Sequence, residues 1–142
     1  MKKFIVASLM YLFFCANTSA QTFDELLEKG DQFYSNANYT ESEKYFTLAI
    51  AVDSKNPKGF WYRGDAREKL KNHDAAIEDY TKAIELGLAT DKLYKARGDS
   101  YFNKNAYEPA AKDYSKAIEL APAKAILWFY RADCYRYLQR RL

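Results

Sequence analysis

Glycine–aspartate pairs recur along this chain of 142 residues at a fixed spacing of 34 positions. Three pairs begin at Gly30, Gly64 and Gly98, and Ala132 takes the place of the glycine in a fourth. A period in the range of roughly 20 to 50 residues is typical of stacked supersecondary units, because one such unit cannot bury its apolar face alone. The period therefore predicts a solenoid, which is a stack of similar units.

Other positions keep one residue type at the same spacing. The columns hold small residues at Ser42, Ala76 and Ala110, aromatic residues at Phe46, Tyr80 and Tyr114, alanines at Ala49, Ala83 and Ala117, and isoleucines at Ile50, Ile84 and Ile118. Residues three or four positions apart share one face of a helix, so Leu26, Gly30 and Phe33 form a stripe. We expect this stripe to face the one that contains Phe46, with small residues allowing two helices to approach closely.

With these columns the chain resembles the tetratricopeptide repeat family from Phe23 to about Leu142. The resemblance implies an all-α fold, a right-handed α-solenoid of antiparallel helix hairpins. Within an array over 21–142, three repeats are expected at about 23–56, 57–90 and 91–124, and the first helix of a fourth at 125–142. Polar breaks predict helices over about 23–36, 39–53, 58–71, 74–87, 91–104, 107–121 and 123–141.

The first twenty residues have a different composition. Lys2 and Lys3 precede an apolar run over 4–16, and small residues end the segment at Ala20. This pattern predicts a secretory signal peptide over 1–20, cleaved after Ala20. The apolar run is shorter than the roughly 20 residues that span a bilayer, so we expect no stable membrane span after cleavage. An uncleaved anchor and lipidation at Cys15 are the alternatives. The short positive start resembles bacterial exports, which predicts a periplasmic or extracellular protein.

Charge is nearly balanced once the signal peptide is removed. Without Lys2 and Lys3, 22 − 2 = 20 lysines and arginines stand against 19 acidic residues, a net charge of about +1. Nucleic-acid binders concentrate basic residues in a stripe, so no nucleic-acid partner is expected. An arginine column at Arg63, Arg97 and Arg131 stands two residues before the aspartate column, and we expect the two columns to form ion pairs between adjacent repeats.

The sequence holds no convincing catalytic or metal-binding set. His73 is the only histidine and falls in a predicted polar turn, without a nucleophile tied to it by spacing. Acidic residues are spread along helices rather than gathered at metal-ligand spacing. Signal cleavage would leave Cys134 as the only cysteine, and its column is mostly small, so we expect a packed structural thiol. No catalytic residue, metal site or cofactor is predicted.

The family resemblance implies a concave groove, lined by the first helix of each repeat, in which a peptide or partner helix lies. The expected groove columns are Leu27, Trp61, Lys95 and Phe129, then Asp31, Asp65, Asp99 and Asp133, then Tyr34, Glu68, Phe102 and Arg136. Four aspartates in one column favour a protein or peptide partner with basic groups. Alternatively, the aspartates pair with the arginine column and present no free charge.

One specificity of the family can be compared with these columns directly. Repeats that grip the carboxyl-terminal tails of heat-shock chaperones clamp a carboxylate with lysine, arginine and asparagine side chains. Here Asp31 stands at the asparagine position and Leu27 at the first lysine position. An acid at that point would repel the tail carboxylate, so this specificity is not expected.

The last predicted helix has no second helix after it to cover Trp128, Ala132 and Tyr135. An exposed apolar face of this kind marks a partner site or an aggregation hazard. Either the array is truncated, or another chain covers the helix. In the second case Trp128, Ala132 and Tyr135 are the expected end interface residues. Two functions follow as hypotheses: an interaction scaffold of the cell envelope that binds partners in its groove, or a structural subunit that forms homo-oligomers through its last helix.

Overall fold

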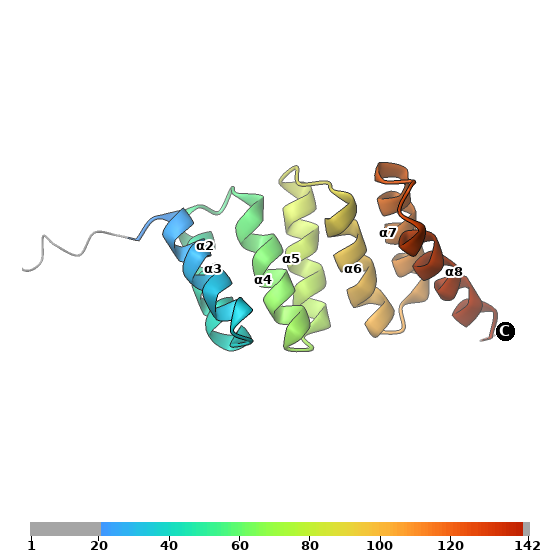
Figure 1. Ribbon diagram of the computed structural model, residues 1–142, viewed down its shortest axis with the longest axis horizontal. Helices are drawn as coiled ribbons and strands as arrows, with labels where there is room; N and C mark the ends of the chain where they lie inside the picture. Colours follow the sequence, from blue (N-terminus) through green and yellow to red (C-terminus); the bar gives the residue numbers. More distant parts are fainter. Residues whose placement is uncertain (1–20, 141–142) are drawn as a thin grey trace, which may run out of the picture.

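The computed structural model describes residues 21–140. Over this range the chain forms seven α-helices and no strand: α2 (Phe23–Ser35), α3 (Tyr39–Val52), α4 (Pro57–Lys69), α5 (His73–Glu85), α6 (Asp91–Asn103), α7 (Tyr107–Leu120) and α8 (Ala125–Gln139). Figure 1 shows them side by side in chain order, as an elongated array. The predicted all-α solenoid is confirmed. The predicted signal peptide, Cys15 included, lies outside the described residues.

The helices pack as three hairpins and a single last helix. Helix α2 packs on α3, α4 on α5 and α6 on α7, and each hairpin then contacts the next element through α3 and α4, α5 and α6, or α7 and α8. Among the first helices of the hairpins, α2 also touches α4, and α4 touches α6. Buried residues form local clusters between neighbouring helices, such as Leu26, Phe46, Ala49 and Ala66. Stability therefore arises from contacts between neighbours, as in other solenoids.

Polar residues start the helices where the sequence predicted breaks. Thr22 accepts a hydrogen bond from the Glu25 amide, and the Glu25 carboxylate accepts one from the Thr22 amide. Side chains of asparagine or threonine also accept backbone hydrogen bonds at the starts of α3, α4, α5 and α6. Each turn within a hairpin contains one left-handed residue, with φ of 58° at Ala37, 64° at Lys71 and 60° at Asn105. The helix ends agree with the predicted ones to within two residues.

The two helices of each hairpin cross closely at the glycine column. A Cβ on Gly30 would lie 2.4 Å from Cε1 of Phe46, and a Cβ on Gly64 would lie 2.6 Å from Cε1 of Tyr80. At Gly98 the corresponding distance to Tyr114 is 3.0 Å. The predicted close approach is confirmed. The aromatic ring fills the space that a side chain larger than that of glycine would take.

The arginine column binds a second set of carboxylates. Arg63 donates two hydrogen bonds to Asp79, of 2.9 and 2.7 Å, and Arg97 donates two of 2.7 Å to Asp113. Both carboxylates are buried and lie on the second helix of the same hairpin. Arg97 also donates to Thr81 of the preceding hairpin, at 3.0 Å. Each arginine thus links consecutive hairpins.

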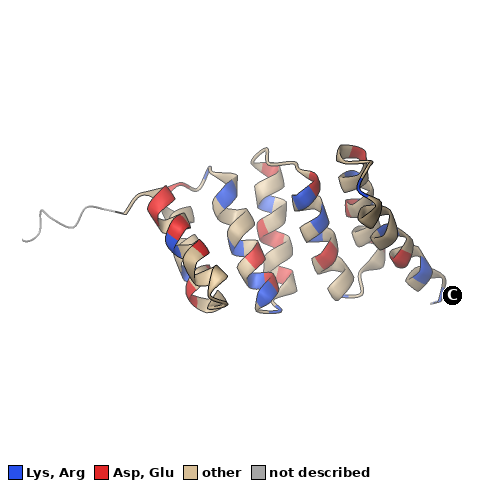
Figure 2. Cartoon of the chain, viewed as in Figure 1, with Lys and Arg blue, Asp and Glu red and all other residues tan. Residues whose placement is uncertain are grey.

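The ion pairs expected between the arginine column and the aspartate column of an adjacent repeat are therefore wrong for Arg63 and Arg97. Residues two positions apart on a helix point to different faces, so these arginines contact the second helix of their own hairpin, whereas Asp65 and Asp99 line pockets along the first helices. The alternative in which these arginines consume the charge of the groove aspartates is wrong for the same reason. Figure 2 shows basic and acidic positions interspersed along the helices.

Candidate peptide-binding groove

The crossing geometry positions the groove aspartates. Tyr80, whose ring lies on Gly64, reaches past it and donates a hydrogen bond of 2.8 Å from its hydroxyl to Asp65. Tyr114 donates a bond of the same length to Asp99. In the first hairpin the residue of this column is Phe46, which has no hydroxyl, and Asp31 of that hairpin is exposed. The glycine, the aromatic residue and the aspartate therefore form one structural unit in the second and third hairpins.

Three pockets lie along the first helices. The N-terminal pocket, of about 90 Å³, is lined by Asp31, Tyr34, Phe46, Tyr62 and Asp65. The middle pocket, of about 230 Å³, is lined by Tyr34, Asp65, Glu68, Lys69, Tyr80, Ala96 and Asp99. The C-terminal pocket, of about 350 Å³, is lined by Glu68, Asp99, Phe102, Asn103, Tyr114, Tyr130 and Asp133. All four members of the aspartate column, with Tyr34, Glu68 and Phe102, thus line one continuous series of pockets.

The remaining predicted groove residues do not line these three pockets. Leu27 is a correction: it is only 9% exposed and packs in the core cluster with Phe46, because its side chain points between the helices rather than into the groove. Trp61 is half-buried, with its ring 5.7 Å from that of Tyr62. Phe129 is 57% exposed, and Arg136 is exposed and forms an ion pair of 2.9 Å with Asp133 on its own helix.

Glu68 holds two first helices together. Its carboxylate accepts hydrogen bonds of 2.6 Å from Ser100 and 2.7 Å from Asn103, both on α6, and lies 2.9 Å from Nδ1 of His73. Desolvation by burial would raise the pKa of Glu68, but the hydrogen bonds from His73, Ser100 and Asn103 together hold this pKa below its usual range. Glu68 therefore contributes to the shape of the groove more than to its free charge.

Asp65 is in a different electrostatic state. Desolvation by burial raises the pKa of its carboxyl to about 6, although the hydrogen bond from Tyr80 acts in the opposite direction. Burial and the nearby carboxylate of Asp65 raise the pKa of Tyr34 to about 12, so this phenol stays neutral. A partly buried carboxylate beside aromatic rings is suited to binding a cation, which would restore the stabilisation lost with water.

Several residues that line the pockets were not identified from the sequence as part of a site. Phe46, Tyr80 and Tyr114 were assigned to the helix crossing alone, yet the edge of each ring also reaches a pocket. Tyr62 and Tyr130 come from a column that holds Ala96 in the third repeat, over 91–124. The spacing of 34 residues would have revealed this column, had it been followed at every position.

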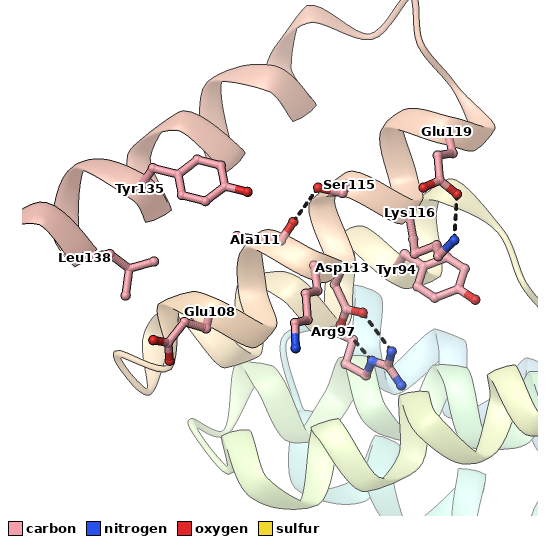
Figure 3. A pocket seen from close by; sticks show the side chains of 11 residues that line it. Tyr94, Arg97, Glu108, Ala111, Asp113, Ser115, Lys116, Glu119, Tyr135 and Leu138 are labelled. Carbon is pink, nitrogen blue, oxygen red and sulfur yellow. Dashed lines mark hydrogen bonds and ion pairs between the residues drawn. The ribbon is translucent and has the colours of Figure 1, made fainter.

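A separate cleft, the end cleft, lies where α8 leaves the array. It measures about 610 Å³ and includes Arg97, Glu108, Asp113, Tyr135 and Leu138 in its lining. In Figure 3, Tyr135 and Leu138 come from one helix and Glu108 from the facing helix, with the ion pair of Arg97 and Asp113 below. The cleft offers both apolar and charged groups.

The predicted end interface residues lie on α8, where Tyr135 lines the end cleft. Trp128 is 46% exposed, Tyr135 is 52% exposed, and Ala132 is also exposed. Trp128 donates a hydrogen bond of 3.0 Å from its indole nitrogen to the carbonyl oxygen of Pro122, and the Arg131 guanidinium lies 4.7 Å from its ring. These contacts fix the indole on the surface of the helix.

Cys134 is fully buried against α7, and burial raises the pKa of its thiol to about 11. A thiol in this state is a poor nucleophile, which agrees with the structural role expected for it. Among residues 21–140, no group of three or more histidine, cysteine, aspartate or glutamate side chains is placed to hold a metal ion. Over the same range, each helix is too short or too polar to cross a bilayer.

Comparison with solved structures finds tetratricopeptide domains with a similar fold. The first tetratricopeptide domain of Spaghetti (RPAP3), bound to the HSP90 peptide SRMEEVD, superposes with a TM-score of 0.80 at 27% identity, covering 85% of this chain and 96% of that one. The first such domain of human RPAP3 gives 0.78 at 27% identity, with coverages of 84% and 94%. The Arabidopsis OM64 domain gives 0.77 at 23% identity, with coverages of 82% and 96%.

Sequence comparison gives the family assignment. No curated protein matches the sequence significantly. The sequence profile described as tetratricopeptide repeat matches residues 27–88 and 95–142, which together make up most of the chain. With the helix hairpins, the glycine crossings and the series of groove pockets in place, this chain belongs to the tetratricopeptide repeat family.

Proposed function

We propose that this chain is a protein-interaction scaffold without a catalytic role, whose groove binds a peptide or partner helix that has basic groups. The supporting observation is the separation of two sets of charges. The Arg63 and Arg97 guanidinium groups are occupied by Asp79 and Asp113, so these arginines do not compensate the groove aspartates. Asp99 pairs with Lys95 and Asp133 with Arg136, whereas Asp31 and Asp65 have no lysine or arginine partner within residues 21–140. Along the pockets the aspartate column then supplies a negative potential that attracts basic side chains.

This preference differs from that of the structurally similar domains. Solved structures of similar domains contain the peptides SRMEEVD and SGPTIEEVD, which end in acidic residues. In this chain Asp31 and Asp65 line the N-terminal pocket, and Leu27 packs inside the core. Acidic tails brought into this groove would meet like charge and lose affinity.

Fluorescence anisotropy with two labelled peptides tests this proposal. The first is SRMEEVD, and the second is the same peptide with lysine at its three acidic positions and an amidated end. We expect only the second to bind, with an affinity that falls as salt is added. Phe102→Ala, which removes a wall of the C-terminal pocket, should weaken that binding, while circular dichroism shows that the variant remains folded. Tighter binding of SRMEEVD than of its lysine counterpart would overturn the proposal.

A second candidate function is self-assembly of the chain through the end cleft and the exposed residues of α8. The observation that favours it is the exposure of Trp128 and Tyr135 beside a large open cleft. Sedimentation of the mature chain at several concentrations tests it, with Tyr135→Glu as the matched variant. A mass that rises with concentration, and falls back to that of the monomer in Tyr135→Glu, would support assembly. A monomer at every concentration would exclude it.

We also propose that the scaffold acts in the cell envelope of a bacterium, after export to the periplasm or beyond. This proposal rests on Lys2, Lys3 and the apolar run that ends at Ala20. Expression of the chain from Met1 in a bacterium, followed by mass spectrometry, should find a mature form that begins at Gln21 in the periplasmic fraction. A cytoplasmic form that retains Met1 to Ala20 would contradict export.

A further inference from the structure

The N-terminal and C-terminal pockets are built from the same five columns of the repeat. Two periods of 34 residues relate Asp31 to Asp99, Tyr34 to Phe102, Phe46 to Tyr114, Tyr62 to Tyr130, and Asp65 to Asp133. The middle pocket differs, because Glu68 and Ala96 replace two of the aromatic rings. The array therefore presents one type of pocket twice, with a different pocket between.

The aromatic rings of the two pockets are also arranged alike. Tyr34 and Tyr39 meet edge to face at 5.3 Å and 68°, and Phe102 and Tyr107 meet at the same distance and angle. On the other side of each pocket, the rings of Phe46 and Tyr62 lie 5.7 Å apart at 51°, and those of Tyr114 and Tyr130 lie 5.5 Å apart at a smaller angle of 28°. The correspondence thus extends from the sequence to the geometry.

The C-terminal pocket already contacts an ammonium group of this chain. Nζ of Lys95 lies 2.7 Å from Oδ2 of Asp99 and 4.7 Å from the centroid of the Tyr130 ring. Both contacts favour a cation: the carboxylate pairs with its charge, and the face of the aromatic ring attracts it. Within this fold, an aspartate and a tyrosine from these two columns therefore bind a lysine side chain.

The N-terminal pocket has the same groups but no cation of its own. The position that corresponds to Lys95 is Leu27, which is packed in the core. Within residues 21–140, neither Asp31 nor Asp65 has a lysine or arginine at ion-pairing distance, and the hydroxyl of Tyr80 is the side-chain partner of Asp65. The pocket measures about 90 Å³, which suits the narrow ammonium end of a lysine better than a broad guanidinium.

We propose that the N-terminal pocket is the specificity subsite of the groove and takes a lysine side chain of the bound partner. The ammonium would meet the carboxylates of Asp65 and Asp31, and the methylene groups would lie against Tyr34 and Tyr62. This inference rests on the proposed function of the groove, and it adds the residue that is recognised and the place where recognition occurs.

Binding at this subsite should depend on pH. Besides Asp65 itself, the titratable or charged groups around it come from four helices: Asp31 and Tyr34 on α2, Glu68 and Lys69 on α4, Tyr80 on α5, and Asp99 on α6. Asp65 must be ionised to pair with lysine, and its pKa of about 6 means that acid removes this charge before it removes that of an ordinary carboxylate. If binding returns the pKa to its ordinary value, affinity should fall about tenfold from pH 7.5 to pH 5.

NMR titration of the isotope-labelled mature chain tests the subsite, because it detects weak binding and locates it. The probe is an acetylated, amidated pentapeptide with one central lysine between alanine and glycine residues, compared with the same peptide containing norleucine or arginine. We expect the lysine peptide to shift the amide resonances of residues around Tyr34 and Asp65. The norleucine peptide should not bind, and the arginine peptide should bind several-fold more weakly. Equal binding of the lysine and norleucine peptides, or tighter binding of the arginine peptide, would overturn the proposal.

Three variants make the assignment specific. Asp65→Asn keeps an acceptor for Tyr80 and should weaken lysine binding about tenfold at pH 7.5 and abolish its dependence on pH. Glu78→Gln, the matched control on an exposed position of α5, should bind as the wild type does. Lys95→Leu copies the first repeat into the third, so it should create a second lysine site around Tyr130. Unchanged binding in Asp65→Asn would overturn the subsite, as would absence of the second site in a folded Lys95→Leu.

The outcome also separates this inference from the proposed function. If the lysine-substituted peptide used for anisotropy binds and Phe102→Ala weakens its binding, but Asp65→Asn does not, the groove binds partners and the subsite is wrong. If that peptide binds to neither the wild type nor any variant, the proposed function of the groove fails, and the subsite fails with it.

Discussion

Two sets of aspartates in this solenoid have the same side chain but different surroundings. Asp79 lies between two arginines, with two hydrogen bonds from Arg63 and an ion pair of 2.9 Å with Arg67. Asp65, on the groove side, receives one hydrogen bond from an uncharged tyrosine. The comparison teaches that charge in a repeat protein must be assigned by its partners. The carboxylate of Asp79 joins the two helices of one hairpin and holds arginines that also reach the preceding hairpin, whereas Asp65 in the groove remains available to a ligand.

The largest expected effect on stability comes from removal of Asp79, the carboxylate that lies between two arginines. Asp79→Ala leaves Arg63 and Arg67 without their shared, buried partner, although Arg67 keeps its ion pair with Glu43. Breaking a buried ion pair on one side typically costs about 3–5 kcal/mol, so we expect a loss of this size in the free energy of unfolding. Urea denaturation followed by circular dichroism measures it, with Glu78→Gln as the control. A loss below about 1 kcal/mol would show that these ion pairs contribute little to the packing of α4 on α5.

An opposite and smaller effect is expected in the groove. The folded-state pKa of Asp65, about 6, lies above its ordinary value of 3.8, so ionised Asp65 destabilises the fold above pH 6 and has no such effect below pH 3.8. Asp65→Asn should therefore raise the free energy of unfolding by about 1–3 kcal/mol at pH 8, and the gain should vanish at pH 3.5. Urea denaturation at the two pH values checks this. A loss of stability at pH 8 would place Asp65 with Asp79 as a structural group.

The smallest effect concerns the hydroxyl that connects the helix crossing to the groove. Tyr80→Phe reproduces the first repeat, where Phe46 lies on Gly30 without a hydroxyl. Removal of this hydrogen bond should cost about 1 kcal/mol of stability at pH 7. It should also raise the pKa of Asp65 further, because the bond from Tyr80 favours the ionised carboxylate. Carboxyl NMR of the variant would detect the shift, and an unchanged or lower pKa would show that Tyr80 has no part in setting it.

The fold followed from the sequence because its determinants are local and repeat. Small residues at Gly30, Gly64 and Gly98, each followed at a fixed distance by an aromatic residue, were enough to predict the hairpins and their close crossing. Polar breaks set the helix ends for the same reason, since caps and left-handed turn residues act within a few positions.

The site could be predicted only in part, because its details depend on the angle between helices. Arg63 meets Asp79, which is sixteen positions away, and no rule for a single helix relates these two residues. Leu27 was placed in the groove by its column, but its side chain packs in the core cluster with Phe46. The pockets were also missed as such, since their aromatic walls come from columns already assigned to packing.

The most direct test of the groove as a cation-binding surface is the pKa of Asp65, measured by carboxyl NMR with and without the lysine pentapeptide. We expect a midpoint near pH 6 in the free protein and a clearly lower midpoint when the peptide is bound, because the ammonium stabilises the ionised carboxylate. A carboxyl that titrates at its ordinary value in the free protein, and does not respond to the peptide, would contradict this account.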